Sequence, residues 1–370
     1  MVCANILEVN GNTPLIELSK INRTFGTNVI VKLEKFNPGG SVKDRAASFL
    51  IEEAERREYL RPGGTIIESS SGNFAISLAM IGAVKGYRVI VIVDPKTTEI
   101  NKTIMKAFGA EIIVVDEKDD TGSYHKTRIL FANQLAKKIK NSFRPDQCFN
   151  VLSAVAHYRK TAREIDEQFK GDLAGIVCAT STGGQIGGIS EYFKKYYLSS
   201  IKIACTDVQG SGIFGGATYS YKTPGVGLGW TPQNIRNVNN VDYVFKITDN
   251  EAYIATRVLC REEGILCGVS SGGVLLAAIK LSSLLGADRP VLALLGDSGE
   301  RYVDTLFNDA WLLANDIPLN NDMNALRMLV TNLSSPQTSP NIKANYQDYL
   351  IKELKIPQTT ITHLEDYMFE

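Results

Sequence analysis

The sequence predicts an α/β fold of two domains, with parallel sheets flanked by helices. Its 370 residues are 44% apolar and 22% charged, enough for a large core and more than one domain. Strand-like apolar runs alternate with helical stretches along most of the chain. Several small-residue loops follow a strand and open a helix, and α/β proteins bind ligands at such carboxyl ends of their strands.

Each predicted element rests on a local pattern in the sequence. Strand-like runs lie, in chain order, at 29–33, 65–67, 88–93, 111–115, 175–178, 201–206 and 291–295. Helical patterns lie at 46–57, 74–80, 102–108, 126–140, 162–169, 250–263 and 274–285. The alternation of the two favours parallel sheets with helices on both faces.

The composition changes after Pro318. A helical stretch at 324–332 is followed by a Ser/Pro-rich break at 334–340 and an amphipathic stretch at 344–354. We expect the 318–370 segment to be a helical extension that packs on its own chain or stabilises a dimer. An active-site lid or a partner-binding arm is the alternative.

The most informative motif is Asn-Pro-Gly-Gly-Ser-Val-Lys-Asp-Arg at 37–45. It puts Lys43 after a glycine-rich turn and ahead of a helical stretch, where unpaired backbone N–H groups carry partial positive charge. That field favours an unprotonated amine, which can attack a carbonyl and form a Schiff base. By itself, such a motif more often marks a surface lysine in a helix cap than a reactive one.

Two further loops change this interpretation. Glu-Ser-Ser-Ser-Gly-Asn at 68–73 follows a strand and opens a helix, so it can hold a substrate carboxylate, with Asn73 beside it. Ala-Thr-Ser-Thr-Gly-Gly-Gln-Ile-Gly-Gly at 179–188 also follows a strand and can close on a phosphate. The alternatives are an ordinary helix cap for the first loop and a tight structural turn for the second.

A reactive lysine, a carboxylate-binding turn and a phosphate loop together match the needs of pyridoxal 5′-phosphate acting on an amino acid. The chain resembles the β-family, or fold type II, pyridoxal-phosphate enzymes, which include cysteine synthases and cystathionine β-synthases. The resemblance runs from Gly-Asn-Thr-Pro-Leu at 11–15 to Asp-Ser-Gly-Glu-Arg-Tyr at 297–302. It covers most of the chain, with the motifs in the family's order.

The resemblance implies roles for individual residues. Lys43 carries the cofactor, Asn73 contacts its 3′-oxygen, and Ser270, in the Gly-Val-Ser-Ser-Gly-Gly run at 268–273, faces its pyridine nitrogen. A neutral serine there leaves the ring nitrogen unprotonated, which favours elimination of a β-substituent. The cofactor phosphate is held by Ser181, Thr182, Gly183, Gly184 and Gln185. The substrate contacts fall on Ser70, Ser71, Gly72 and Phe74.

The chain departs from the family pattern at three positions. Ser69 stands where the family usually has proline, Phe74 where it has threonine, and Gln185 where the phosphate loop ends in threonine. The first two changes indicate an altered substrate. The family's arrangement also implies a large domain at 1–43 and 150–317, and a small mobile domain at 44–149 that closes over it.

Several segments resemble the branch that makes N-(2-amino-2-carboxyethyl)-L-glutamate, a precursor of 2,3-diaminopropionate in siderophore and antibiotic pathways. They lie at 93–96, 122–128, 207–215 and 224–227. That branch joins O-phospho-L-serine to L-glutamate, and Arg128 falls where a guanidinium could meet the substrate phosphate. A surface helix arginine is the alternative for Arg128.

Two other functions stay open. The 297–302 run resembles a plain cysteine synthase, which would use sulfide with O-acetylserine or O-phosphoserine. A weakly active binding or regulatory homologue is the alternative from another class, and the presence of Lys43, Asn73 and Ser270 argues against it.

Charge and cysteine content bear on the binding partners and the cellular location of the protein. Forty basic and 40 acidic residues balance, so nothing suggests a nucleic-acid or membrane partner. The start of the chain lacks the pattern of a signal peptide, and no apolar run is long enough to span a bilayer. The six cysteines form no CxxC pair, which favours free thiols over a metal site or disulfides. We therefore expect a cytoplasmic protein without a bound metal. Separately, we expect the enzyme to be a homodimer.

Overall fold

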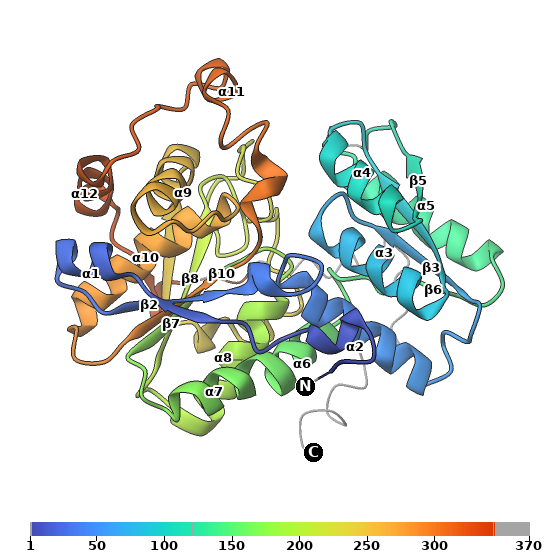
Figure 1. The fold of residues 1–370 in the computed structure, drawn as a ribbon, viewed down its shortest axis with the longest axis horizontal. Coiled ribbons are helices and arrows are strands. Elements are labelled where there is room, and N and C mark those ends of the chain that lie inside the picture. Colours follow the sequence, from blue (N-terminus) through green and yellow to red (C-terminus); the bar gives the residue numbers. More distant parts are fainter. Residues whose placement is uncertain (1, 120–121, 343, 345–370) are drawn as a thin grey trace.

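The computed structural model describes residues 2–119, 122–342 and 344. The chain forms two lobes, each built on its own β-sheet with helices around it (Figure 1). One sheet has seven strands and the other has four. This confirms the predicted class of an α/β protein with parallel sheets flanked by helices.

The larger sheet has the strand order β1-β2-β10-β7-β8-β9-β11. Its five central strands are parallel, and β1 and β11 pair antiparallel at the two edges. The strands are β1 (Leu15–Glu17), β2 (Val29–Leu33), β7 (Gly175–Ala179), β8 (Lys202–Val208), β9 (Tyr243–Ile247), β10 (Val291–Leu295) and β11 (Gln337–Thr338).

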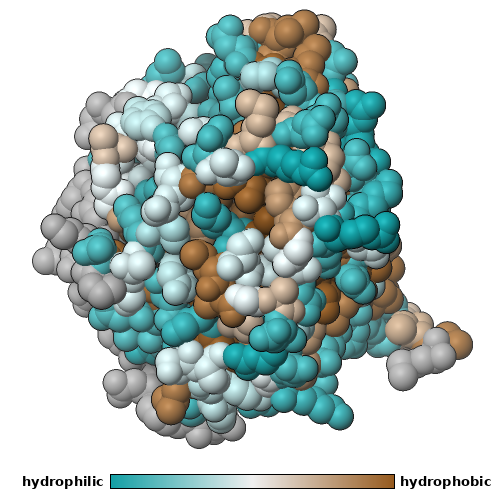
Figure 2. Space-filling view, turned by 90° about the vertical axis from the view of Figure 1, so that its left-hand side faces the viewer, coloured by the Kyte–Doolittle hydropathy of each residue, from teal (hydrophilic) through white to brown (hydrophobic). Residues whose placement is uncertain are grey.

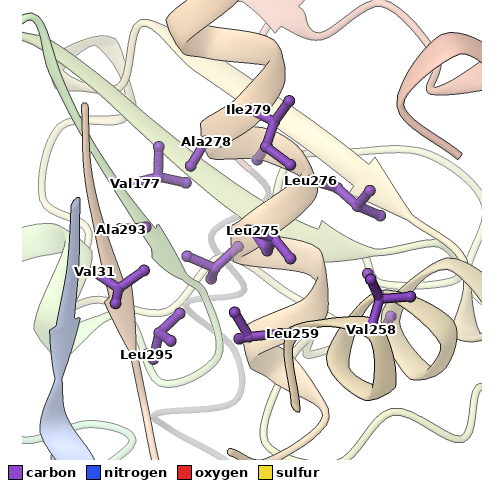
Figure 3. Packing of buried hydrophobic residues seen from close by; sticks show 14 of the residues in the cluster. Val31, Val177, Val258, Leu259, Leu275, Leu276, Ala278, Ile279, Ala293 and Leu295 are labelled. Atoms are coloured by element: carbon purple, nitrogen blue, oxygen red, sulfur yellow. The ribbon is translucent and has the colours of Figure 1, made fainter. Parts of the chain in front are cut away.

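Helices cover both faces of this sheet. Alternate residues of a strand point to opposite faces. Val177 and Ala293 accordingly belong to one apolar cluster, and Ile176 and Leu292 belong to a second cluster on the other face. Figure 3 shows the first of these clusters. The first face carries α1 (Ser19–Phe25), α9 (Asp249–Glu263), α10 (Ser270–Leu285) and α12 (Met323–Asn332). The second carries α6 (Leu152–Ala156), the π-helix η3 (His157–Ala162), α7 (Arg163–Phe169) and α8 (Gly184–Tyr197).

The smaller sheet is wholly parallel, in the order β5-β4-β3-β6. Its strands are β3 (Thr65–Ser69), β4 (Arg88–Val93), β5 (Glu111–Val114) and β6 (Ser142–Phe143). The helices of this lobe are α2 (Lys43–Arg56), α3 (Asn73–Lys85), α4 (Glu99–Ala107) and α5 (His125–Lys138). Helix α3 is apolar nearly all round because it is buried among its neighbours.

Short elements complete the fold. They are α11 (Asp309–Ala314) and the 3₁₀ turns η1 (Ile6–Val9), η2 (Glu34–Phe36), η4 (Val238–Asn240), η5 (Gly299–Tyr302) and η6 (Ser339–Asn341). The start of the predicted extension belongs to the large lobe, since α12 packs on α9 and α10 and β11 joins the sheet edge. Except for its first residue, the amphipathic helix expected at 344–354 lies outside the described residues.

The surface and the cysteines bear on the expectations about membranes, metals and disulfides. Figure 2 shows one face, on which hydrophilic side chains mix with scattered apolar ones. Within the described residues we find no helix that could cross a membrane, and no cluster of side chains suited to a metal ion. All six cysteines are free thiols.

Candidate active site

A cavity lies between the lobes, where parallel strands of the large sheet end. Its empty volume is about 590 Å³ and it opens to solvent. Loops that follow strands and open helices converge there, as expected for an α/β fold. Eight residues singled out in the sequence line it together: Lys43, Asn73, Ser181, Thr182, Gly183, Gly184, Gln185 and Ser270.

Lys43 is the first residue of α2 and is half-buried in the cavity wall. Burial lowers the pKa of its amine, an effect that the nearby Asp297 opposes. The next residue, Asp44, accepts a hydrogen bond from the Gly39 amide at 2.6 Å and another from the Ser77 hydroxyl at 2.5 Å. Asp44 thereby fixes the backbone around Lys43 to both the preceding turn and helix α3. Burial raises the pKa of Asp44 to about 6.

The loop after β7 has the features of an anion-binding site. Helix α8 begins at Gly184, so its first backbone N–H groups have no partner within the helix. Gly183 has a φ of 79°, in the left-handed region, and a Cβ atom there would lie 2.8 Å from Pro232 Cγ. Asn234 braces the loop by donating to the Thr182 carbonyl at 2.9 Å. The Nε2 atom of Gln185 is buried and has no hydrogen-bond partner among the described residues.

Ser270 and Asn73 reach the cavity from opposite lobes. Ser270 begins α10, which packs closely on α9 because Gly272 leaves room for the Ala252 carbonyl. Asn73 begins α3 and donates to an oxygen of Asp297 at 2.7 Å. Asp297 lies two residues after the end of β10 in the large lobe, so this hydrogen bond joins the two lobes.

Comparison with known proteins identifies this arrangement. Residues 6–297 match the family described as "Pyridoxal-phosphate dependent enzyme". The chain belongs to this family. Its cofactor is therefore pyridoxal 5′-phosphate, and the family and cofactor predicted from the sequence are confirmed.

Individual relatives give the same result for the family. This pyridoxal-phosphate enzyme is 38% identical over 316 residues to the N-(2-amino-2-carboxyethyl)-L-glutamate synthase of Cupriavidus metallidurans, and the match covers 84% of this chain and 92% of that protein. It is 38% identical over 315 residues to a probable cysteine synthase of Bacillus subtilis, covering 84% and 98%. The crystal structure of O-ureido-L-serine synthase superposes with a TM-score of 0.77 at 29% identity, covering 85% of this chain and 100% of that one. The chain is an enzyme of the β-replacement type.

The cavity of this pyridoxal-phosphate enzyme fits the cofactor chemically. An amine whose pKa is lowered suits attachment of an aldehyde. The unpartnered Gln185 Nε2 and the start of α8 supply donors for a phosphate. These groups lie in one cavity, together with the hydroxyl-bearing Ser270.

Not every residue proposed from the sequence lines this cavity. The Phe74 side chain is only 1% exposed and packs in the core of the small lobe. Ser70 is buried, and the Ser71 carbonyl accepts a hydrogen bond from Asn101 at 3.1 Å. Gly72 immediately precedes α3, in the loop that also carries these serines. The loop thus lies beside the cavity, on the side of the small lobe.

Arg128 is also buried, on α5 of the small lobe. Its Nη1 atom lies 3.0 Å from an oxygen of Asp94, while its Nε has no hydrogen-bond partner among the described residues. Burial lowers the pKa of this guanidinium, and the charge of Asp94 opposes the effect. Asp94 belongs to the 93–96 segment noted in the sequence, but nothing in its local pattern links it to a position 34 residues later.

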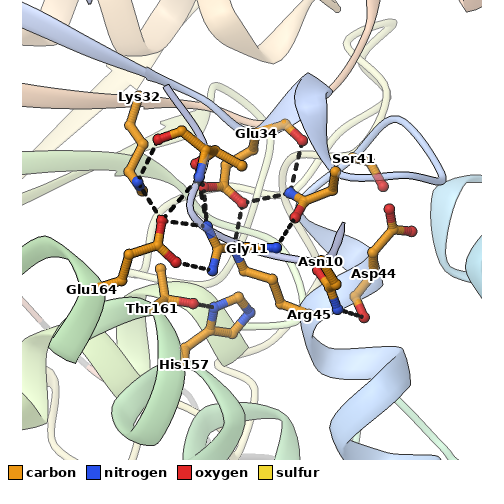
Figure 4. A network of polar contacts seen from close by, with 12 residues as sticks. Asn10, Gly11, Lys32, Glu34, Ser41, Asp44, Arg45, His157, Thr161 and Glu164 are labelled. Atoms are coloured by element: carbon orange, nitrogen blue, oxygen red, sulfur yellow. Dashed lines mark hydrogen bonds and ion pairs between the residues drawn. The ribbon is translucent and has the colours of Figure 1, made fainter. Parts of the chain in front are cut away.

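A polar network around Arg45, two residues after Lys43, was not predicted from the sequence. Arg45 lies between the carboxylates of Glu34 and Glu164, and Lys32 contacts Glu164 as well (Figure 4). Its members come from β2, η2, α2 and α7. These charged residues lie far apart in the sequence and in different elements, so no local sequence pattern indicates that they meet in the fold. The network anchors the helix that begins with Lys43.

Proposed function

We propose that the enzyme replaces the phosphate of O-phospho-L-serine with the amino group of L-glutamate, forming N-(2-amino-2-carboxyethyl)-L-glutamate. The observation that carries this proposal is the buried Arg128, whose Nη1 is paired with Asp94 and whose Nε has no hydrogen-bond partner among the residues that the structure describes. A guanidinium with a spare donor suits a doubly charged phosphate leaving group better than a neutral acetate. The relative from Cupriavidus metallidurans supports the same reaction.

The chain's own residues would divide the work as follows. Lys43 would hold the cofactor, Ser181 to Gln185 would bind its phosphate, and Ser270 would interact with its ring nitrogen. When bound, pyridoxal phosphate supplies the electron sink that makes the substrate α-proton acidic. The Lys43 amine, once released by the incoming amino acid, would remove that proton. Burial lowers its pKa and so favours the unprotonated form that can act as a base.

The small lobe would bind the amino-acid substrate. The 70–72 loop, next to the N-terminus of α3, would receive the substrate carboxylate, and Arg128 would receive the phosphate. We propose that the 44–149 unit closes over the 1–43 and 150–317 unit once substrate binds. Closure would exclude water from the β-carbon of the substrate until the nucleophile attacks it.

A cysteine synthase activity is the second candidate. A relative named as a probable cysteine synthase matches this chain at the same identity and over the same share of it. The two reactions share their first half and differ in the nucleophile that attacks the β-carbon. Sulfide is small, whereas glutamate carries two carboxylates, so the second half of the reaction distinguishes them.

A competition experiment tests the proposal. The purified enzyme with pyridoxal phosphate is given O-phospho-L-serine with equal concentrations of glutamate and sulfide, and the products are identified by mass spectrometry. The proposal expects the glutamate adduct as the main product, and O-acetyl-L-serine to be a much poorer donor. Cysteine as the main product would refute it in favour of the second candidate.

A further inference from the structure

Asp297 is a buried carboxylate in the wall of the cavity, and the function proposed above gives it no task. It is 4% exposed and follows β10. One of its oxygens, Oδ2, accepts hydrogen bonds from Asn73 Nδ2 at 2.7 Å and from the Tyr302 hydroxyl at 2.6 Å. A Cβ atom on Gly268 would clash with the other oxygen, Oδ1. Only a glycine at position 268 leaves enough room for this carboxylate.

Arg301, four residues after Asp297, contacts the same asparagine. It donates to the side-chain oxygen of Asn73 and to the carbonyl of Gly39. A side-chain amide has one oxygen acceptor and one NH₂ group with two donors. With Arg301 at the oxygen and Asp297 at the nitrogen, the amide of Asn73 can adopt only one of its two orientations.

This orientation leaves one donor available. Asn73 Nδ2 carries two hydrogens, and Asp297 receives only one of them. Among the described residues, no other side chain accepts from Nδ2. Because Asn73 lines the cavity, its second N–H is available to a bound molecule there. The reversed amide would present an oxygen, which would repel an anionic ligand atom.

We propose that Asp297 and Arg301 are positioning residues, which orient the Asn73 amide so that it donates a hydrogen bond to the ring oxygen of pyridoxal phosphate. This inference rests on the proposed function, which places the cofactor beside Asn73. The carboxylate selects the nitrogen and the guanidinium selects the oxygen. Both residues come from the 297–302 segment of the large lobe. The orientation of the Asn73 amide, in the small lobe, is therefore determined by the opposite lobe.

Burial of the Asp297 charge supports a specific task. An isolated buried carboxylate is costly, and burial raises the pKa of Asp297 while the hydrogen bonds from Tyr302 and Asn73 oppose this. The charged and titratable groups around Asn73 are Lys43 and Asp44 from α2, and Asp297, Arg301 and Tyr302 from the facing segment. Of these, Asp297 and Arg301 bond directly to the side-chain amide.

The test compares two cofactors that differ only in the ring oxygen. Dissociation constants are measured for pyridoxal 5′-phosphate and its 3-deoxy analogue with the wild type, Asp297→Asn, Arg301→Gln and Asn73→Ala. The preference that remains in Asn73→Ala is the intrinsic difference between the ligands. Relative to that variant, we expect the wild type to favour the oxygen-bearing cofactor by about tenfold or more.

Asp297→Asn and Arg301→Gln are expected to lose most of that extra preference, because either change lets the amide reverse. Glu300→Gln is the matched control on the same segment, since its side chain is 62% exposed, and it should keep the wild-type preference. If Asp297→Asn and Arg301→Gln weaken both cofactors by the same factor, the residues are merely structural and the inference is wrong. If Asp297→Asn does not fold, Arg301→Gln alone decides.

The outcomes also separate this inference from the proposed function. A wild type that binds neither cofactor, or that shows no more preference than Asn73→Ala, contradicts the placement of the cofactor itself. A wild type with the extra preference, and positioning variants that retain it, contradicts only the inference.

Discussion

Arg45 donates hydrogen bonds to both carboxylate oxygens of Glu164, at 2.7 and 3.0 Å. The pair joins helix α7 to helix α2 two residues after Lys43 (Figure 4). Burial opposes ionisation of Glu164, but the hydrogen bonds and charges of Arg45 and Lys32 outweigh it and lower the pKa of Glu164 to about 2. The carboxylate is therefore charged at any pH at which the enzyme is expected to work.

The first prediction concerns acid stability. A carboxyl pKa that is lower in the folded state stabilises the fold above its unfolded value of about 4.5, and this contribution is lost as pH falls toward 2. After allowance for solvent screening it amounts to about 1–3 kcal/mol. Glu164→Gln should lower the free energy of unfolding at pH 7 and converge with the wild type near pH 2, measured by denaturant titration. Glu167→Gln, exposed on the same helix, is the control. A constant difference at every pH would contradict this account.

Much of the fold could be predicted from the sequence because its strands are apolar and its helices long. The predicted runs at 29–33, 88–93 and 291–295 coincide with β2, β4 and β10. Strands of two or three residues, such as β6 and β11, were missed because they are too short to show a pattern. The π-helix η3 was missed as well, since the 3.6-residue periodicity does not report a local change of hydrogen-bond partner.

The site was predictable where a loop motif carries it, and not where distant residues meet. Lys43 and the 181–185 loop stand in recognisable strand–loop–helix settings. The hydrogen bond between Asn73 and Asp297 spans 224 positions, which no local pattern reports. Phe74 was predicted as a substrate contact from its place after Asn73, but an apolar residue fits a core equally well, and the structure buries it there.

The second prediction concerns the catalytic base. Lys43→Ala should abolish turnover of O-phospho-L-serine, because proton transfer by a positioned base alone contributes about 10²- to 10⁴-fold. The variant should still bind pyridoxal phosphate through the 181–185 loop, more weakly than the wild type. Phosphate release measures the rate, and Lys35→Ala is a nearby lysine control. Turnover within tenfold of the wild type would refute the role of Lys43.

The third prediction concerns the leaving group. Arg128→Ala should lower kcat/KM for O-phospho-L-serine by roughly 10- to 150-fold, the worth of a hydrogen bond to a charged group. The loss with O-acetyl-L-serine should be much smaller, because the acetyl group is neutral. Arg88→Ala removes an exposed arginine paired with Glu111 and should leave both rates unchanged. Equal losses for the two donors would remove the phosphate-binding role of Arg128.

The fourth prediction concerns the support of the phosphate loop. An alanine at Gly187, inside α8, would clash with the backbone oxygen of Asn234, the residue that braces Thr182. Alanine normally favours a helix over glycine, so a loss of about 1–3 kcal/mol in the free energy of unfolding would reverse the usual sign. Gly229→Ala, where an added Cβ meets no atom within 4 Å, should be close to neutral. A stabilised Gly187→Ala variant would show that this contact yields easily.

The central claim is that Lys43 holds the cofactor in the cavity between the lobes. Borohydride reduction of the purified protein with pyridoxal phosphate, followed by proteolysis and mass spectrometry, reports which lysine carries the cofactor. The account predicts the phosphopyridoxyl mass on the peptide that contains Lys43 and its absence from that peptide in Lys43→Ala. A cofactor fixed instead to Lys32 or Lys35 would contradict the site as described.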